Sequence, residues 1–268
     1  MAQHNARPFI LHEATYRQAL DWKPVVAILP WGATEAHNWH LPHGTDNIEA
    51  TALAEAAAEL AAEADARCIV LPTVPFGNNN TQLTQVATIT MRTCTQQALL
   101  FDVADSLVKQ GIHRLVLLNF HGGNDFKAII RDVMLDLPIF IVQVNGYQLV
   151  AEQLKVILDD PRTGHADEFE TSLLLHLKPK WVAPLEQAGT GATTPSQLPV
   201  LSSTPGAWFP RDWQTLTADT GDGDPQAATA EKGTRLMAVM ADRLSKLLIE
   251  LAQAQEGQFP FIIRRWDR

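Results

Sequence analysis

The sequence predicts an α/β fold with a largely parallel sheet that is covered by helices on both faces. Short runs rich in β-branched residues alternate along the chain with longer segments that carry apolar residues at helical spacing. This alternation is typical of parallel sheets, because each strand is joined to the next by a helical crossover. The chain has 268 residues, of which 46% are hydrophobic. We therefore expect a single domain spanning residues 1–268.

The strands and helices of this pattern follow one another in a regular order. The first two strand segments are each followed by a proline and have the uniformly apolar character of strands buried on both faces. The segment between them is rich in Ala and Glu, which favour helix. The predicted strands are 25–29, 68–71, 114–118 and 138–144, and the predicted helices between them are 47–66, 93–110 and 125–135.

A long loop of about residues 185–225 follows, where the composition shifts to Gly, Thr, Ser and Pro. It carries Trp208, Phe209 and Trp213, whose large apolar surfaces are costly to leave in water. We expect these rings to be covered by the protein's own surface, by a neighbouring subunit or by the substrate pocket. A final amphipathic helix is predicted over 226–253.

Composition excludes several classes of function. The formal net charge is −9 and the basic residues are scattered, so the chain offers no basic stripe to nucleic acid. No apolar stretch reaches the roughly 18 residues that a membrane-spanning helix needs. Only Cys68 and Cys94 are present, which is too few for a disulfide framework and typical of a reducing compartment. We expect a cytoplasmic protein without nucleic-acid or membrane partners.

Residues 32–46, with the sequence GATEAHNWHLPHGTD, hold the first cluster of polar side chains. They follow the strand 25–29, at the edge where open α/β sheets place their ligands. Glu35 and His37 are two residues apart, so in an extended segment they present an oxygen and a nitrogen to one spot. Asp46 is predicted at the N-cap of the helix 47–66, so it is either only a cap or a further ligand.

Residues 119–125, with the sequence NFHGGND, form the second cluster and again lie between a strand and a helix. Two glycines allow a close approach of the backbone, and His121 is either a turn residue or a ligand at the sheet edge. Together, Glu35, His37, Asp46 and His121 form a mixed nitrogen and oxygen set that suits Zn, Mn or Fe.

The third cluster, residues 164–172 with the sequence GHADEFETS, precedes a run of leucines and is predicted to occupy the first turns of a helix. For Asp167 a helix-dipole role is favoured. Glu170 adjoins the apolar run, and a buried carboxylate needs a partner. It is therefore a candidate ligand.

The three clusters together resemble the creatininase (creatinine amidohydrolase) family. The matching pieces are E-x-H at Glu35 and His37, LP-x-GTD at 41–46, HGGN at 121–124 and H-A-x-E-x-E-T-S at 165–172, with the supporting segment GDPQAATAEKG at 223–233. These pieces sample the chain from about residue 25 to 240. The resemblance implies a three-layer α/β/α sandwich and a homo-oligomer, often a hexamer.

The resemblance also implies a site with one or two divalent metal ions per subunit. Carried over by position, Asp46 bridges two ions, Glu35 and His121 complete one, and His37 helps to hold the other. His165 and Glu168 are assigned to catalysis, with His165 carrying the proton to the departing group. Creatininase has a glutamate at the position of Gly123, so either Glu170 or Glu168 replaces it as a ligand, or the second metal site is weak.

A second departure concerns the substrate. Many members carry a His where this chain has Gln82, and an FPG where it has Gln-Val-Ala at 85–87. An Asn- and Gln-rich wall offers donors and acceptors to a hydroxylated or amide-rich small molecule, unless it is only a solvated loop. The residues expected to contact substrate are Asn79, Gln82, Gly122, Gly123 and Asn124.

These expectations combine into a metal-dependent hydrolase that opens or cleaves a small cyclic amide, or a related polar carbonyl compound, with hydroxide generated at the metal. An alternative is a C–C hydrolase that opens a polyhydroxylated cyclic ketone of the inosose type. A second alternative is a non-catalytic protein of the same fold that binds a small molecule or a metal. A Ser/His/Asp hydrolase is disfavoured because the chain has no G-x-S-x-G.

Overall fold

Four parallel strands form the central sheet in the order β2-β1-β3-β4. The computed structural model describes residues 7–260. The strands are β1 (Val26–Trp31), β2 (Cys68–Val70), β3 (Arg114–Asn119) and β4 (Phe140–Asn145). β1 and β3 lie in the middle of the sheet, so their carboxyl ends meet at one edge. The predicted α/β fold with a parallel sheet is confirmed.

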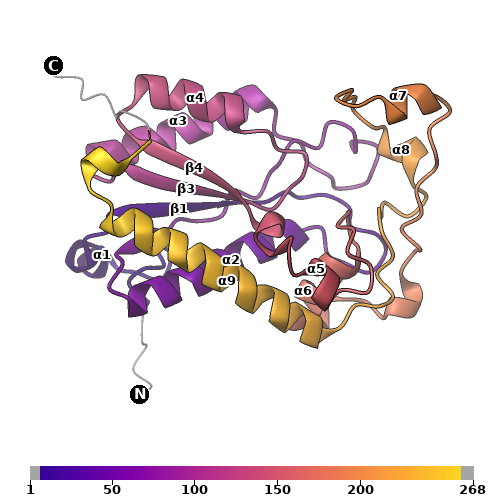
Figure 1. Ribbon diagram of the computed structural model, residues 1–268, viewed down its shortest axis with the longest axis horizontal. Coiled ribbons are helices and arrows are strands. Elements are labelled where there is room, and N and C mark those ends of the chain that lie inside the picture. The colour runs from indigo at the N-terminus through magenta and orange to yellow at the C-terminus, as the bar shows by residue number, and fades with distance from the viewer. Residues whose placement is uncertain (1–6, 261–268) are drawn as a thin grey trace.

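Helices cover both faces of this sheet (Figure 1). Val26 and Ile28 of β1 point into one hydrophobic core, whereas Ala27 and Leu29 point into the other, as the alternation of side chains along a strand requires. The first core is closed by α2 (Thr45–Glu63), α6 (Glu168–Leu177) and α9 (Ala230–Gln253), and the second by α3 (Thr93–Lys109) and α4 (Lys127–Asp136). The three-layer arrangement is thereby confirmed.

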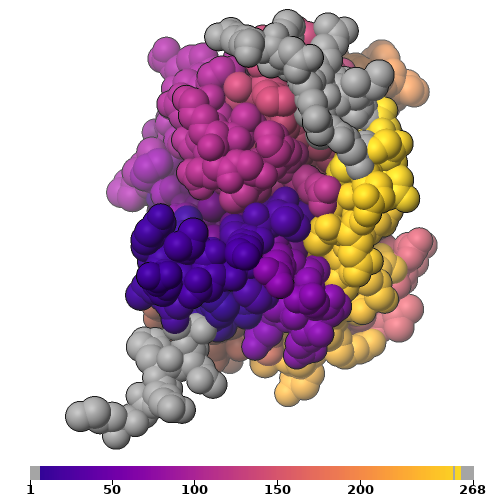
Figure 2. All heavy atoms as spheres, turned by 90° about the vertical axis from the view of Figure 1, so that its left-hand side faces the viewer, coloured from indigo at the N-terminus to yellow at the C-terminus, as the bar shows by residue number. Residues whose placement is uncertain are grey.

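The remaining elements are short. They are α1 (Tyr16–Trp22), η1 (Gly146–Val150), α5 (Leu154–Ile157), η2 (Pro179–Trp181), η3 (Leu185–Gln187), α7 (Pro199–Ser203), α8 (Trp213–Leu216) and η4 (Glu256–Gln258). The long loop therefore contains three short helices and is not structureless. In Figure 1, α7 and α8 lie beyond one end of the sheet. Figure 2 looks onto the opposite end, which is formed by the N-terminal segments in indigo, by helices in magenta and by the yellow α9. Within residues 7–260 no helix has the length and apolar character to cross a bilayer.

Three predicted helix starts differ from the structure, of which α4, beginning at Lys127 rather than 125, differs without changing the role of any candidate site residue. α2 begins at Thr45 after Gly44, so Asp46 is not the N-cap but lies in the first turn. The last helix begins at Ala230 rather than 226, because Thr229 caps it by accepting a hydrogen bond from the backbone N–H of Lys232. Cys68 is buried and Cys94 is exposed.

Candidate metal centre

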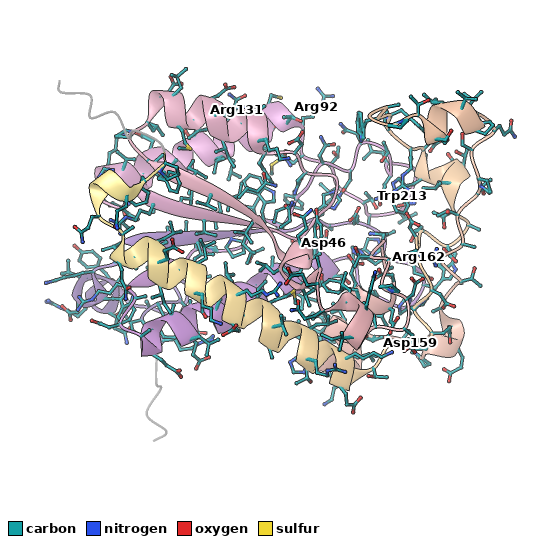
Figure 3. The ribbon with its side chains drawn as sticks, viewed as in Figure 1. Asp46, Arg92, Arg131, Asp159, Arg162 and Trp213 are labelled. Atoms are coloured by element: carbon teal, nitrogen blue, oxygen red, sulfur yellow. The ribbon has the colours of Figure 1, made fainter. Side chains whose placement is uncertain are left out.

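Acidic and histidine side chains converge at the carboxyl ends of β1 and β3. Three groups of three residues each present ligand atoms that lie within 4.8 Å of one another. These groups are Glu35–Asp46–His121, His37–Asp46–Glu170 and Glu35–His37–His165. Figure 3 shows Asp46 between the end of the sheet and the segment that carries Trp213. The side chains singled out from three separate sequence clusters therefore meet at one point.

Each histidine of the cluster turns one ring nitrogen outward to a backbone carbonyl. His37 uses Nδ1 toward the carbonyl oxygen of Glu35 at 3.0 Å, and His165 uses Nε2 toward that of Ala36 at 2.8 Å. His121 uses Nε2 toward the carbonyl oxygen of Asn78 at 3.1 Å. Because a carbonyl oxygen only accepts, the outer nitrogen of each ring carries the proton. The inner nitrogen then directs its lone pair at the cluster, as in histidines that ligate metals.

Asp46 stands between the two halves of the cluster. Its Oδ1 lies 2.7 Å from Nε2 of His37, and its Oδ2 lies 3.2 Å from Nδ1 of His121. Nδ1 of His121 is also 2.8 Å from Oε1 of Glu35. With their outer nitrogens protonated, these rings have no inner hydrogen to donate, so both oxygens of Asp46, Oε2 of Glu35 and Nε2 of His37 lack a hydrogen-bond partner despite the short distances. Buried polar atoms this close without a hydrogen between them are the donor set that divalent cations would need.

The electrostatics of the cluster also favour bound cations. Burial is the largest single influence on His37 and opposes its charge, but Asp46, Glu170 and Glu35 together outweigh it and raise the pKa of His37 to about 10. Burial likewise opposes charge on His121, and Glu35 and Asp46 raise its pKa well above the ordinary value. For Glu35 burial favours the neutral form, but His121 and His165 lower its pKa. The buried carboxylates of the cluster are therefore stabilised by nearby positive charge. Divalent cations would supply that charge in place of protons on the histidine rings.

His165 differs from the other two histidines. Burial and the neighbouring His37 lower its pKa, so the ring is neutral at physiological pH. Its Nδ1 lies 3.8 Å from Oε1 of Glu35, and its ring centroid lies 4.2 Å from that of His37. A neutral imidazole with an unprotonated nitrogen facing the cluster is able either to accept a proton or to bind a cation.

The N-terminus of α6 orients the two glutamates of the third cluster in different directions. Asp167 is the N-cap, where its side chain accepts from the backbone N–H of Glu170 at 3.1 Å. Glu170 accepts from the backbone N–H of Ala166 and places Oε2 3.8 Å from Nε2 of His37. Burial raises the pKa of Glu170 to about 8, against the attraction of His37. Glu170 therefore joins the cluster.

Glu168 does not join it. Its carboxylate accepts hydrogen bonds from the backbone N–H groups of Asp159 and Asp160 and from Nζ of Lys232. It does not line the cavity at the cluster. Along a helix, Glu168 and Glu170 are separated by about 200°, so the two carboxylates cannot serve the same site. The catalytic assignment of Glu168 is not supported by this position, which instead anchors the segment 159–160.

Two glycines hold the ring of His121. A methyl group at Gly123 would lie 2.4 Å from Nε2 of His121 and 2.4 Å from the carbonyl oxygen of Asn78. One at Gly77 would lie 2.6 Å from Cδ2 of His121. By contrast, a methyl group at Gly122 would meet nothing within 4 Å. Gly123 is therefore a packing requirement here, and Glu170 occupies the other half of the cluster.

A cavity of about 520 Å³ opens onto the cluster. Of the residues expected to contact substrate, Gln82, Gly122 and Gly123 line it. Asn79 and Asn124 do not. Asn79 donates to the carbonyl oxygen of Ile89 at 3.0 Å, and Asn124 accepts from the backbone N–H of Asn78 at 2.9 Å, so both brace the wall from behind. Oε1 of Gln82 is buried and has no hydrogen-bond partner.

The long loop also lines the cavity, through the three aromatic residues for which the substrate pocket was one expected environment and through Arg211 and Asp222, which sequence patterns did not indicate. Trp213 packs edge-on against His165, with ring centroids 5.0 Å apart. Trp208, Phe209, Arg211 and Asp222 come from the same long loop and complete this wall. The aromatic residues of the loop were noted from composition, but their place beside His165 depends on the course of some forty residues.

Glu49 is a further buried acid that sequence patterns did not indicate. It lies on α2, three residues after Asp46, is fully buried, and neither carboxylate oxygen has a hydrogen-bond partner. Burial, followed by repulsion from Glu170 and Asp46, raises its pKa well above the ordinary value. The only signal was a lone acid on the buried face of an Ala-rich helix.

Comparison with known proteins gives consistent results. The family model described as creatininase, creatinine amidohydrolase, matches residues 12–248. A mycofactocin precursor peptide peptidase of Mycobacterium tuberculosis is 33% identical over 239 residues, which cover 87% of this chain and 87% of the relative. The same-named protein of Mycolicibacterium smegmatis is 31% identical over 250 residues, covering 91% and 94% respectively.

Solved structures agree on the fold. A putative creatinine amidohydrolase from Bacteroides fragilis has a TM-score of 0.84 and 37% identity, covering 92% of this chain and 98% of its own. A manganese form of creatininase has a TM-score of 0.73 at 21% identity, covering 92% and 99%. A Zn-Zn form of a mutant creatininase has a TM-score of 0.75 at 20% identity, with the same coverage. These last two show the fold alone.

Proposed function

Because the chain belongs to the creatininase family, we propose that it is a metal-dependent hydrolase that cleaves an amide bond in a peptide, with zinc or manganese as its metal. The observation that carries this proposal is the set of buried, unpaired ligand atoms around Asp46. Relatives above 30% identity are named peptide peptidases. A cavity of about 520 Å³ lies within the range of roughly 300–1,000 Å³ that ligand sites occupy, and it admits more than one small ring.

The residues divide between two ion positions. Glu35, Asp46 and His121 would hold one ion, and His37, Asp46 and Glu170 would hold the other. Two divalent cations in such a pair supply water activation near neutral pH and stabilise negative charge on the attacked carbonyl. His165 accepts or returns a proton at Nδ1, because its Nε2–H is already engaged with Ala36. Gln82 Oε1 orients a substrate N–H group.

A cyclic amide is the second candidate substrate. The Bacteroides fragilis neighbour, at 37% identity, is described as a putative creatinine amidohydrolase. Hydrolysis of a cyclic amide uses the same attack on a carbonyl as hydrolysis of a linear one. The two differ in the size and shape of what must fit between the polar wall at Gln82 and the loop at Trp213.

The test is a substrate panel with product identification. The chain, loaded with zinc or manganese, is incubated with a peptide library, cyclic amides and cyclic polyhydroxylated ketones, and mass spectrometry identifies which bond breaks. We expect hydrolysis of peptide amide bonds. Exclusive turnover of cyclic amides would transfer the proposal to the second candidate. C–C cleavage of the ketones, or no turnover in a metal-loaded chain, would reject amide hydrolysis.

Asp46→Ala is the variant that ties activity to the cluster. Changes in residues that only support metal ligands already cost about 10–100-fold, so loss of Asp46 itself is expected to exceed roughly a hundredfold in turnover. Elemental analysis should show lower metal content, with folding retained. His12→Ala, at an exposed histidine remote from the cluster, is the matched control and should behave as wild type. Unchanged metal occupancy in Asp46→Ala would contradict the assignment.

A further inference from the structure

Arg211 is the single Lys or Arg among the described residues that line the cavity. It lies in the loop just before α8, and its side chain is 49% exposed. Nη1 donates to Oδ2 of Asp222 at 3.0 Å, and the guanidinium carbon lies 5.4 Å from the ring centroid of Trp213. A cation at the rim of an otherwise acidic and aromatic cavity is a candidate determinant of substrate choice.

The structure holds Arg211 near the candidate catalytic histidine from two directions. Trp213, on which the guanidinium is stacked, packs edge-on against the ring of His165. Asp222, which binds Nη1, is paired through its backbone with His165, by an N–H to carbonyl hydrogen bond in each direction at 2.8 and 2.9 Å. The loop position of Arg211 is therefore fixed relative to the reacting end of the cavity.

Most of the guanidinium remains free for a ligand. Arginine has five N–H donors in a planar fork, and within residues 7–260 only Nη1 of Arg211 donates to a protein acceptor, Asp222. The neighbouring Arg162 differs, because it binds Asp160 through Nε and Nη2 and does not line the cavity. Figure 3 shows Arg162 and Trp213 at the same end of the molecule, so the two arginines form a natural comparison.

Charge in the cavity is consistent with an anionic substrate. Glu35, Asp46 and Glu170 face the cluster, where the proposed cations neutralise them. Arg211 and Asp222 form a further ion pair in the lining, on the wall contributed by the long loop. A carboxylate approaching this wall meets the free N–H groups of Arg211 in the fork geometry that carboxylates bind best.

We propose that Arg211 binds a carboxylate of the substrate, so that the enzyme selects an amide bond near a free carboxylate. This rests on the hydrolase function proposed above. The apolar lining from Trp208, Phe209 and Tyr147 favours an aromatic or large apolar side chain beside that carboxylate. The competing explanation is that Arg211 only latches the loop to Asp222.

The first test compares paired peptides. A library ending in phenylalanine is prepared once with a free carboxylate and once as the carboxamide, and kcat/KM is measured for wild type and four variants. A hydrogen bond to a charged group contributes about 1.5–3 kcal/mol, so Arg211→Gln should lower kcat/KM on the carboxylate library by about 10–150-fold and change the carboxamide library little. Arg211→Lys should recover part of the loss. Arg162→Gln should match wild type.

Asp222→Asn distinguishes binding of the substrate carboxylate by Arg211 from a purely structural role in which Arg211 ties the loop to Asp222. If Arg211 binds substrate, this variant keeps the preference for the carboxylate library, because Arg211 is still present and loses only its protein partner. If Arg211 is only a latch, Asp222→Asn and Arg211→Gln depress both libraries alike, and the proposal is wrong.

A binding measurement keeps this inference separate from the function. L-phenylalanine and L-phenylalaninol share the ring and the amine, neither has an amide to hydrolyse, and only the first has a carboxylate. Calorimetry on the metal-loaded chain should show tighter binding of phenylalanine, with the difference reduced in Arg211→Gln. If phenylalanine binds more tightly in this way but no peptide is hydrolysed, the proposed hydrolase function is wrong and the carboxylate site at Arg211 stands. If peptides are hydrolysed but phenylalanine and phenylalaninol bind equally well to wild type and to Arg211→Gln, only the carboxylate site is wrong.

Discussion

The cavity has two walls of different construction. The inner wall consists of buried side chains at the ends of β1 and β3 and in the first turns of α2 and α6, where Glu35 and Asp46 are each 1% exposed. The outer wall is a loop in which Trp208 is 85% exposed and Arg211 is half exposed. The difference indicates that the inner wall fixes the chemistry on a rigid scaffold, whereas the outer wall sets which substrate is chosen.

His165→Ala is expected to give the largest loss of turnover without loss of metal, and it sharpens the division inside the inner wall. A positioned acid or base contributes about 10²–10⁴ in rate, so kcat should fall by that factor while elemental analysis finds the wild-type metal content. Loss of metal comparable to that of Asp46→Ala would make His165 a ligand through its Nδ1.

Gly123→Ala tests whether backbone packing, and not only ligand identity, holds the inner wall. The added methyl group lies 2.4 Å from the imidazole of His121 and must displace it. We expect metal affinity to fall by about 10–100-fold, as for other changes that move a ligand without removing it. Gly122→Ala is the matched control, since its methyl group meets nothing within 4 Å. Equal metal affinities in Gly123→Ala and Gly122→Ala would show that the ring of His121 moves aside without loss of metal binding.

Trp208→Ala and Trp213→Ala probe the outer wall separately. Trp213 is only 8% exposed and contacts His165, so its removal should raise KM several-fold and also lower kcat. Trp208 is exposed, so its removal should raise KM alone, or shift the predicted homo-oligomer toward smaller species if a neighbouring subunit covers it. Steady-state kinetics and light scattering measure these outcomes. Identical kinetics and size in both variants would leave the two rings with packing roles only.

Glu49→Gln is expected to have the smallest effect on turnover. Its effect on the free energy of unfolding shows whether Glu49, buried behind the inner wall, is neutral in the folded chain. A buried acid with a raised pKa must take up a proton on folding, so wild-type stability falls as pH rises above 4.5, the ordinary value. The variant lacks this penalty, and its free energy of unfolding relative to wild type should rise by up to about 1.4 kcal/mol per pH unit. Denaturant titrations of chelated protein at pH 4 to 8 measure it.

Glu59→Gln, at an exposed position on the same helix, is the control for Glu49→Gln and should show no such slope. If the difference between Glu49→Gln and wild type stayed constant over this pH range, Glu49 would be ionised in the folded chain and would need a cationic partner.

Local patterns in the sequence determined much of the fold and of the inner wall. The runs 25–29 and 114–118 specify buried strands by residue type alone, and parallel strands joined by helices bring their carboxyl ends to one edge. Glu35, His37 and His121 lie a few residues beyond such a strand end, and Asp46 lies in the first turn of the helix that follows β1. Their convergence follows from local structure plus one topological rule, without knowledge of any side-chain contact.

Tertiary structure alone decided the finer features. Whether Glu168 or Glu170 reaches the cluster depends on which face α6 turns toward it, and the packing of α6 on α2 and α9 decides this. The place of Arg211 beside His165 depends on a loop that is fixed by contacts such as the backbone pairing of His165 with Asp222. These residues are separated by fifty-odd positions, and no local propensity connects them. The sequence therefore determines which chemistry the chain carries, and long-range packing decides which side chains take part and what they can select.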